Sequence, residues 1–126
     1  MRLRIETREA PVRTARHWVT AHVEGMDLPQ DVVTVAELLT SELVGNAVVH
    51  GRDPIAVDVH LGDGVLTIEV SDEGDGLPVL RTTGPDVPGG QGVRLVEQLA
   101  TRWGVEQRGA VGKTVWFAVA TDAVER

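Results

Sequence analysis

The sequence predicts an α+β fold in which helices stack on one face of a largely antiparallel sheet. Two long segments carry apolar residues at helical spacing, and two shorter ones alternate apolar and polar residues across the tight-turn sequence Gly62-Asp63-Gly64. A second pair of strand-like segments closes the chain. In chain order, the expected elements are a strand at 2–6, helices at 11–24 and 28–50, strands at 55–61 and 66–70, a helix from Gly92, and strands at 102–108 and 113–120.

The N-terminal segment predicts a short one-sided strand followed by an amphipathic helix. Leu3 and Ile5 alternate with charged residues, as on a strand with one buried face. Pro11 stands at a favourable first helical position, and Gly25 ends the helix. The apolar positions between them recur at helical spacing: Val12, Ala15, Val19 and Val23.

The segment from Leu28 to His50 predicts a long central helix, with Gly51 at its C-terminal cap position. Glu42 and Asn46 fall inside its apolar arc, although a carboxylate or an amide is seldom buried without a partner. They either serve a function or lie at the edge of the arc in contact with water. The arc is centred on Val32, Ala36, Leu39, Leu43 and Ala47, and the positions expected to face solvent are Thr34, Glu37, Ser41 and Gly45.

The hairpin at 55–70 and the segment after it differ in character. Asp58 and His60 point to the outer face of the hairpin, where we expect a structural role. Residues 72–91 are rich in glycine, proline and aspartate, so they do not form a regular element. Their length exceeds that of a routine connection, which favours a functional loop. The expected inner face of the hairpin comprises Ile55, Val57, Val59, Leu61, Leu66, Ile68 and Val70.

Composition limits the class of protein. The chain of 126 residues suits a single domain, 1–126, and its 42% hydrophobic and 25% charged residues are typical of a globular protein. The net charge of −7 argues against nucleic-acid binding as the main function. No apolar run approaches the roughly 20 residues of a membrane span, no signal peptide is evident, and cysteine is absent. We therefore expect a cytoplasmic protein with no nucleic-acid or membrane partner.

Asp72-Glu73-Gly74-Asp75-Gly76 directly follows a predicted strand. An aspartate at a strand end can accept a hydrogen bond from an exocyclic amine, and the glycines let backbone approach a flat ligand closely. The alternatives are an acidic turn or a calcium loop. The calcium alternative is disfavoured, because the spacing lacks the alternating aspartates and the distal glutamate of an EF-hand.

Gly89-Gly90-Gln91-Gly92 leads into a predicted helix. Free N–H groups at a helix N-terminus attract phosphate oxygens, so this segment is a candidate anion site. The alternative is a flexible loop with an ordinary N-cap. A Rossmann fingerprint is excluded, because the glycines follow a long loop and the third glycine is absent.

The segment 109–114, Gly-Ala-Val-Gly-Lys-Thr, superficially resembles a Walker A loop. That loop needs four residues between its glycines and a helix after it. Here two residues separate the glycines, and Lys113 opens a predicted strand. A hairpin turn is therefore expected.

Taken in this order, the motifs resemble those of the GHKL superfamily of ATPases and kinases, and more closely the small bacterial anti-sigma-factor serine/threonine kinases. Residues 42–50, Glu-Leu-Val-Gly-Asn-Ala-Val-Val-His, resemble the N box of that family. Residues 72–76 and 89–92 resemble its two glycine boxes, and 103–104 and 112–117 its closing strands. The resemblance implies the Bergerat fold, a two-layer α/β sandwich.

The resemblance also implies roles for single residues. Asn46 would hold Mg²⁺ against the phosphates of ATP. Glu42 would be the general base for the substrate hydroxyl. Asp72 would bind the adenine amine, with Gly74 and Gly76 shaping the adenine pocket.

Further roles follow for the remaining motif positions. Gly90 and Gly92 would cradle the phosphates. Between them, Gln91 stands where relatives often have an arginine. Arg94 or Arg81 could substitute for that arginine. Thr114 is a weaker adenine-side contact. His50 is expected to be structural rather than catalytic.

The resemblance thus implies an ATP- and Mg²⁺-dependent protein serine/threonine kinase, an anti-sigma factor that phosphorylates a small antagonist protein. A sigma factor and a second copy of the chain are further expected partners. One alternative is a nucleotide-gated binding module without kinase activity, motivated by Gln91. The catalytic half of a sensor histidine kinase is disfavoured, because no dimerisation helix with an acceptor histidine precedes the motifs. A purely structural protein would leave the polar and glycine features unexplained.

Overall fold

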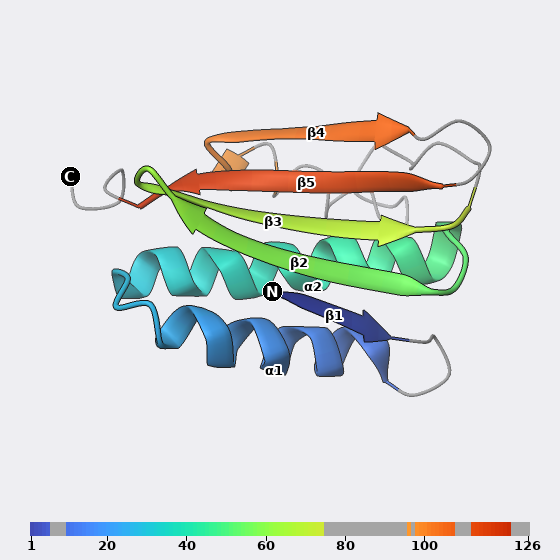
Figure 1. Cartoon of the computed structure of the whole chain (residues 1–126), viewed down its shortest axis with the longest axis horizontal. Helices are drawn as coiled ribbons and strands as arrows, with labels where there is room; N and C mark the ends of the chain where they lie inside the picture. Colours follow the sequence, from blue (N-terminus) through green and yellow to red (C-terminus); the bar gives the residue numbers. More distant parts are fainter. Residues whose placement is uncertain (6–9, 75–95, 97, 108–111, 122–126) are drawn as a thin grey trace.

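The computed structural model describes residues 1–5, 10–74, 96, 98–107 and 112–121. The molecule has two layers, with a five-stranded sheet in front of two helices in Figure 1. This arrangement confirms the predicted α+β class. The elements are β1 (Arg2–Ile5), α1 (Pro11–Glu24), α2 (Gln30–His50), β2 (Ile55–Gly62), β3 (Val65–Asp72), β4 (Arg102–Gln107) and β5 (Lys113–Ala120).

The sheet has the strand order β1-β2-β3-β5-β4, and every neighbouring pair is antiparallel. The hairpin register pairs Val57 with Val70 and Val59 with Ile68, as the alternation predicts. β5 lies between β3 and β4, and its first residue, Lys113, pairs with Asp72, the last residue of β3. Because Lys113 opens a strand, the expectation that this segment is no Walker A loop is confirmed.

The core lies between the sheet and the helices. α1 contributes Ala15, Val19 and Val23, all fully buried. Among the described helices, only α2 is long and apolar enough to cross a membrane by length and composition. Its apolarity has another explanation here, since it packs on both α1 and the sheet. The buried residues of α2 are Val32, Val33, Ala36, Leu39, Thr40, Leu43, Val44 and Ala47.

Two expectations for α2 need correction. Glu37 does not simply face solvent: it is half-buried and accepts a hydrogen bond from Thr20 Oγ1 of α1, because α1 packs against that side of α2. On the other flank, Leu38 is 38% exposed and Val49 is 69% exposed, although both belong to the predicted apolar arc. Within the described part of the chain, this flank, which also carries Glu42, is left open to solvent.

The segment after residue 91 is only partly described. Val96 is helical and buried, in agreement with the predicted helix, whereas Leu99 is 39% exposed. The rest of the predicted third helix lies outside the described residues.

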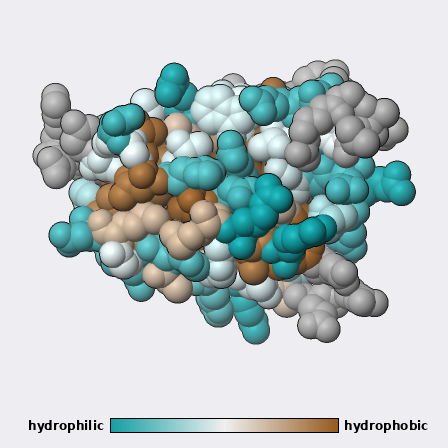
Figure 2. Space-filling view, in the orientation of Figure 1, coloured by the Kyte–Doolittle hydropathy of each residue, from teal (hydrophilic) through white to brown (hydrophobic). Residues whose placement is uncertain are grey.

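The outer face of the sheet carries polar side chains (Figure 2). Arg2 Nη2 lies 2.9 Å from Asp58 Oδ2, and Arg2 Nε lies 3.0 Å from Asp58 Oδ1. The hydrogen bond and the charge of Asp58 raise the pKa of the Arg2 guanidinium. His60 Nε2 lies 3.7 Å from Glu69 Oε1. Asp58 and His60 thus join neighbouring strands, which agrees with the structural role predicted for them.

This geometry yields a matched pair of variants. Arg2→Ala should lower the free energy of unfolding by about 1 kcal/mol, because the largely buried Asp58 carboxylate loses its two-pronged partner. Arg4 lies on the same strand and is exposed, and its side chain forms no hydrogen bond with a described residue, so Arg4→Ala should change stability by less than about 0.5 kcal/mol. Urea denaturation of both variants measures the difference, and equal effects would contradict it.

Candidate functional site

The site is built around Asp72, whose side chain is 2% exposed at the end of β3. Its Oδ1 atom accepts three hydrogen bonds, from Gly74 N at 2.7 Å, Lys113 Nζ at 3.0 Å and Arg52 N at 3.3 Å. Its Oδ2 atom accepts none from the described residues. A carboxylate oxygen with unused lone pairs is therefore left for another donor.

Glycines leave the room that this carboxylate occupies. A Cβ atom on Gly51 would lie 2.5–2.6 Å from Asp72 Cγ and both carboxylate oxygens, and one on Gly74 would lie 2.9 Å from Oδ1. At Gly112, a Cβ would collide with the Asp72 carbonyl oxygen, and the backbone has a φ of +142° that L side chains rarely adopt. The glycines fit the prediction that backbone comes close to a flat group here, and Gly74 is one of those predicted.

Gly51 follows α2, as predicted, and its N–H donates to Ala47 O at 2.8 Å. Gly51 is therefore the C-cap as predicted, and its φ of −106° and ψ of −158° are extended rather than left-handed. The contact with Asp72 is the reason that this position needs glycine.

The end of α2 meets the end of β3 at this point. Arg52 donates its N–H to Asp72, and Glu73 N donates to Arg52 O at 3.1 Å. Asn46 and His50 occupy the last two turns of α2, so they share this end of the molecule with Asp72.

Three polar residues in the second half of α2 have free side-chain hydrogen-bonding capacity among the described residues. Glu42 and Asn46 are half-buried, and the side chain of neither forms a hydrogen bond with a described residue. His50 Nε2 is buried and has no hydrogen-bond partner in the part of the chain that the structure describes. Because buried polar atoms are nearly always paired, the unpaired His50 nitrogen, on the same helix as these two half-buried side chains, fits a ligand site at this end of α2.

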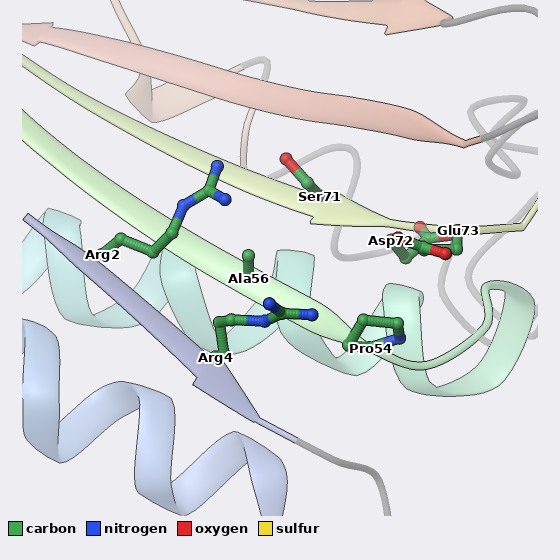
Figure 3. Close-up of a pocket in the computed structure, with 7 residues that line it drawn as sticks. All are labelled: Arg2, Arg4, Pro54, Ala56, Ser71, Asp72 and Glu73. Atoms are coloured by element: carbon green, nitrogen blue, oxygen red, sulfur yellow. The ribbon is translucent and has the colours of Figure 1, made fainter.

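Thr114 lies on the other side of the sheet from the Asp72 carboxylate. Its hydroxyl is 2.8 Å from Ser71 Oγ, and both residues are buried. On that outer side, a cavity of about 170 Å³ reaches the end of β3. Figure 3 shows the β1 arginines extending along β2 beside it. Its lining comprises Arg2, Arg4, Pro54, Ala56, Ser71, Asp72 and Glu73.

Lys113 is the site residue that sequence reasoning did not find. Its side chain is 2% exposed, and it is the residue of β5 that contacts the Asp72 carboxylate. A signal was present, since a lysine between Gly112 and an apolar strand sits where burial is expected. Identifying its partner required the pairing of β3 with β5.

The remaining predicted positions, Gly76, Gly90, Gln91 and Gly92, lie outside the described residues. The residues that are described fit a nucleotide. Asp72 Oδ2 suits an exocyclic amine, and the Asn46 amide oxygen suits Mg²⁺, which prefers a few protein oxygens plus phosphate and water. Among the described residues, no cluster of three His, Cys, Asp or Glu side chains could hold a metal by itself.

Alanine variants of two glycines in this region distinguish a steric requirement for glycine from the effect of glycine on helix stability. Gly51→Ala should lower the free energy of unfolding by about 1–3 kcal/mol, because the new Cβ overlaps the Asp72 carboxylate. Gly45→Ala has open space inside α2 and should raise stability by about 0.5–1 kcal/mol. Thermal unfolding followed by circular dichroism measures both, and a stabilising Gly51→Ala would contradict the contact.

Comparison with known proteins agrees with this geometry. The family model described as "Histidine kinase-like ATPase domain" matches residues 5–119. The anti-sigma F factor of Geobacillus stearothermophilus is 32% identical over 133 residues, which covers 95% of this chain and 91% of that protein.

Two solved structures share the fold. One contains the RsbU and RsbW domains of a Mycobacterium tuberculosis protein, with a TM-score of 0.72 and 22% identity over 94% of this chain and 32% of that chain. The other is the histidine kinase domain of a blue-light-activated histidine kinase from Erythrobacter litoralis, with a TM-score of 0.61 and 21% identity over 89% of this chain and 66% of that chain. Matched over nearly its whole length, the chain belongs to the histidine kinase-like ATPase domain family.

Proposed function

We propose that this protein binds Mg²⁺-ATP and transfers its γ-phosphate to a serine or threonine of a small antagonist protein, in the manner of an anti-sigma factor. The observation that carries the proposal is the buried Asp72 carboxylate, held among glycines with one oxygen to which no described residue bonds, at the same end of the molecule as the half-buried side chain of Asn46. The similarity to the Geobacillus stearothermophilus anti-sigma F factor supports the anti-sigma part of the proposal.

Three groups of residues would bind the Mg²⁺-nucleotide. Asp72 Oδ2 would accept a hydrogen bond from the adenine amine, with Gly74 and Gly76 beside the base. Gly90, Gln91 and Gly92 would contact the phosphates through backbone N–H groups. The amide oxygen of Asn46 would hold Mg²⁺, which supplies charge neutralisation when bound.

Glu42 would accept the proton of the attacking hydroxyl. It lies one helical turn before Asn46, so the two side chains are neighbours on the helix surface. The hydroxyl oxygen forms a bond to the γ-phosphorus as the bond to ADP breaks, and its proton passes to the Glu42 carboxylate. Such transfer depends on positioning and on charge stabilisation more than on covalent chemistry.

The partners and the location belong to the same proposal. The small antagonist would be the phosphorylation substrate, a sigma factor would be the regulated target, and the chain would act as a homodimer in the cytoplasm. Gln91 motivates an alternative, in which ATP binding gates a protein-binding surface and no phosphate is transferred.

Titration calorimetry with ATP tests the nucleotide site. Wild type should bind ATP more tightly with Mg²⁺ than without it, and Asn46→Ala should remove most of that difference, a loss of about tenfold or more in affinity. The same variant should bind metal-free ATP nearly as wild type does. No binding at millimolar ATP would refute the proposed function.

Glu42→Gln tests the chemical step. The variant keeps the size of the side chain but lacks a proton acceptor, so phosphotransfer should fall by about 10²–10⁴-fold while ATP binding is retained. The assay follows label from γ-³²P-ATP into proteins of a soluble extract from the source organism, with Glu37→Gln as a control on the opposite side of α2. Undiminished transfer would exclude Glu42 as the base, and absence of any labelled protein with wild type would favour the gated binding module.

A further inference from the structure

Lys113 is a fully enclosed cation that the proposed mechanism does not use. Lysine is almost never buried unless it is paired, and burying two charges costs several kcal/mol before their attraction is counted. Lys113 and Asp72 are each 2% exposed, with Nζ 3.0 Å from Oδ1. A pair of this kind, at the first residue of one central strand and the last of its neighbour, is weak evidence for stability alone.

The pair makes the two oxygens of Asp72 different from one another. Oδ1 receives Lys113 Nζ as well as the N–H groups of Gly74 and Arg52, and no described residue bonds to Oδ2. Of the two backbone donors, only Gly74 is close, since Arg52 N is at 3.3 Å. Lys113 is thus the donor that brings positive charge to Oδ1 and ties the carboxylate to β5.

We propose that Lys113 is a positioning residue for base recognition. By occupying Oδ1 and balancing the charge of Asp72, it holds Oδ2 as the one oxygen open to the amino group of a 6-aminopurine. The inference rests on the proposed nucleotide site and adds the residue that sets its selectivity. An ionised carboxylate is acceptor-only, so the held oxygen favours adenine and rejects a 6-oxo group, which is also an acceptor.

The test compares two nucleotides that differ in the 6-amino group alone. Titration calorimetry with Mg²⁺ gives the dissociation constants of ATP and of purine riboside triphosphate. Wild type should prefer ATP by about ten- to a hundredfold, the factor expected for one hydrogen bond to a charged acceptor. Lys113→Met keeps the apolar stem but not the ammonium, and its preference should fall to within about threefold of unity.

A merely structural lysine gives a different result. In that case Lys113→Met would weaken both nucleotides by the same factor and leave the preference intact, which would overturn the inference. Ser71→Ala is the matched control: Ser71 is buried next to Asp72, but its hydroxyl bonds to Thr114 on the opposite side of the sheet. It should retain the wild-type preference.

A second variant covers the case in which Lys113→Met is too unstable to purify. Asp72→Asn with Lys113→Met removes both buried charges together. The Asn oxygen should take the Gly74 N–H, leaving the amide NH₂ where Oδ2 was, so the double variant should prefer inosine triphosphate to ATP. Retained preference for ATP would overturn the assignment of Oδ2 as the atom that recognises the base, and with it the positioning role of Lys113. Wild type that binds neither ATP nor purine riboside triphosphate would instead refute the nucleotide site itself, together with the inference built on it.

Discussion

The hydrogen bonding of one buried carboxylate connects the two layers of this protein. Asp72 Oδ1 accepts from Arg52, two residues after α2, from Gly74 beyond β3 and from Lys113 at the start of β5. A buried charge persists only when such partners are in place. The positions of the helix end and of both central strands are therefore coupled. The same need to pair a buried charge stabilises the fold and shapes the site.

The periodic parts of the chain could be predicted from sequence, because their burial follows from local spacing. The pairing of Val57 with Val70 is an example, since alternation and a two-glycine turn determine it. The contact of Glu37 with Thr20 could not be predicted, because it depends on which side of α2 receives α1. The pairing of Lys113 with Asp72 needed the non-consecutive order of β3 and β5, which no local pattern contains.

The motifs, too, were only partly predictable from the sequence. Asp72 and Gly74 stand together at a strand end as expected, and Gly51 caps α2 as predicted but also has a steric role that its position in the sequence did not indicate. Capping alone explains a glycine after a helix, so only the position of the Asp72 side chain reveals the steric role. Likewise, Thr114 and Lys113 are adjacent in sequence, and strand alternation places the lysine, not the threonine, on the carboxylate.

The adjacency of β3 and β5 has a consequence for how this site can change. Lys113 and Asp72 are 41 residues apart in sequence, yet they pair across neighbouring strands. The entropy of closing such a loop grows only with the logarithm of its length, roughly 0.6 kcal/mol for each doubling. Apart from β4, which pairs with β5, the segment between the two residues can therefore vary in length at little entropic cost. Insertions and deletions there could alter contacts to a ligand or a partner protein while the carboxylate and its lysine stay in place.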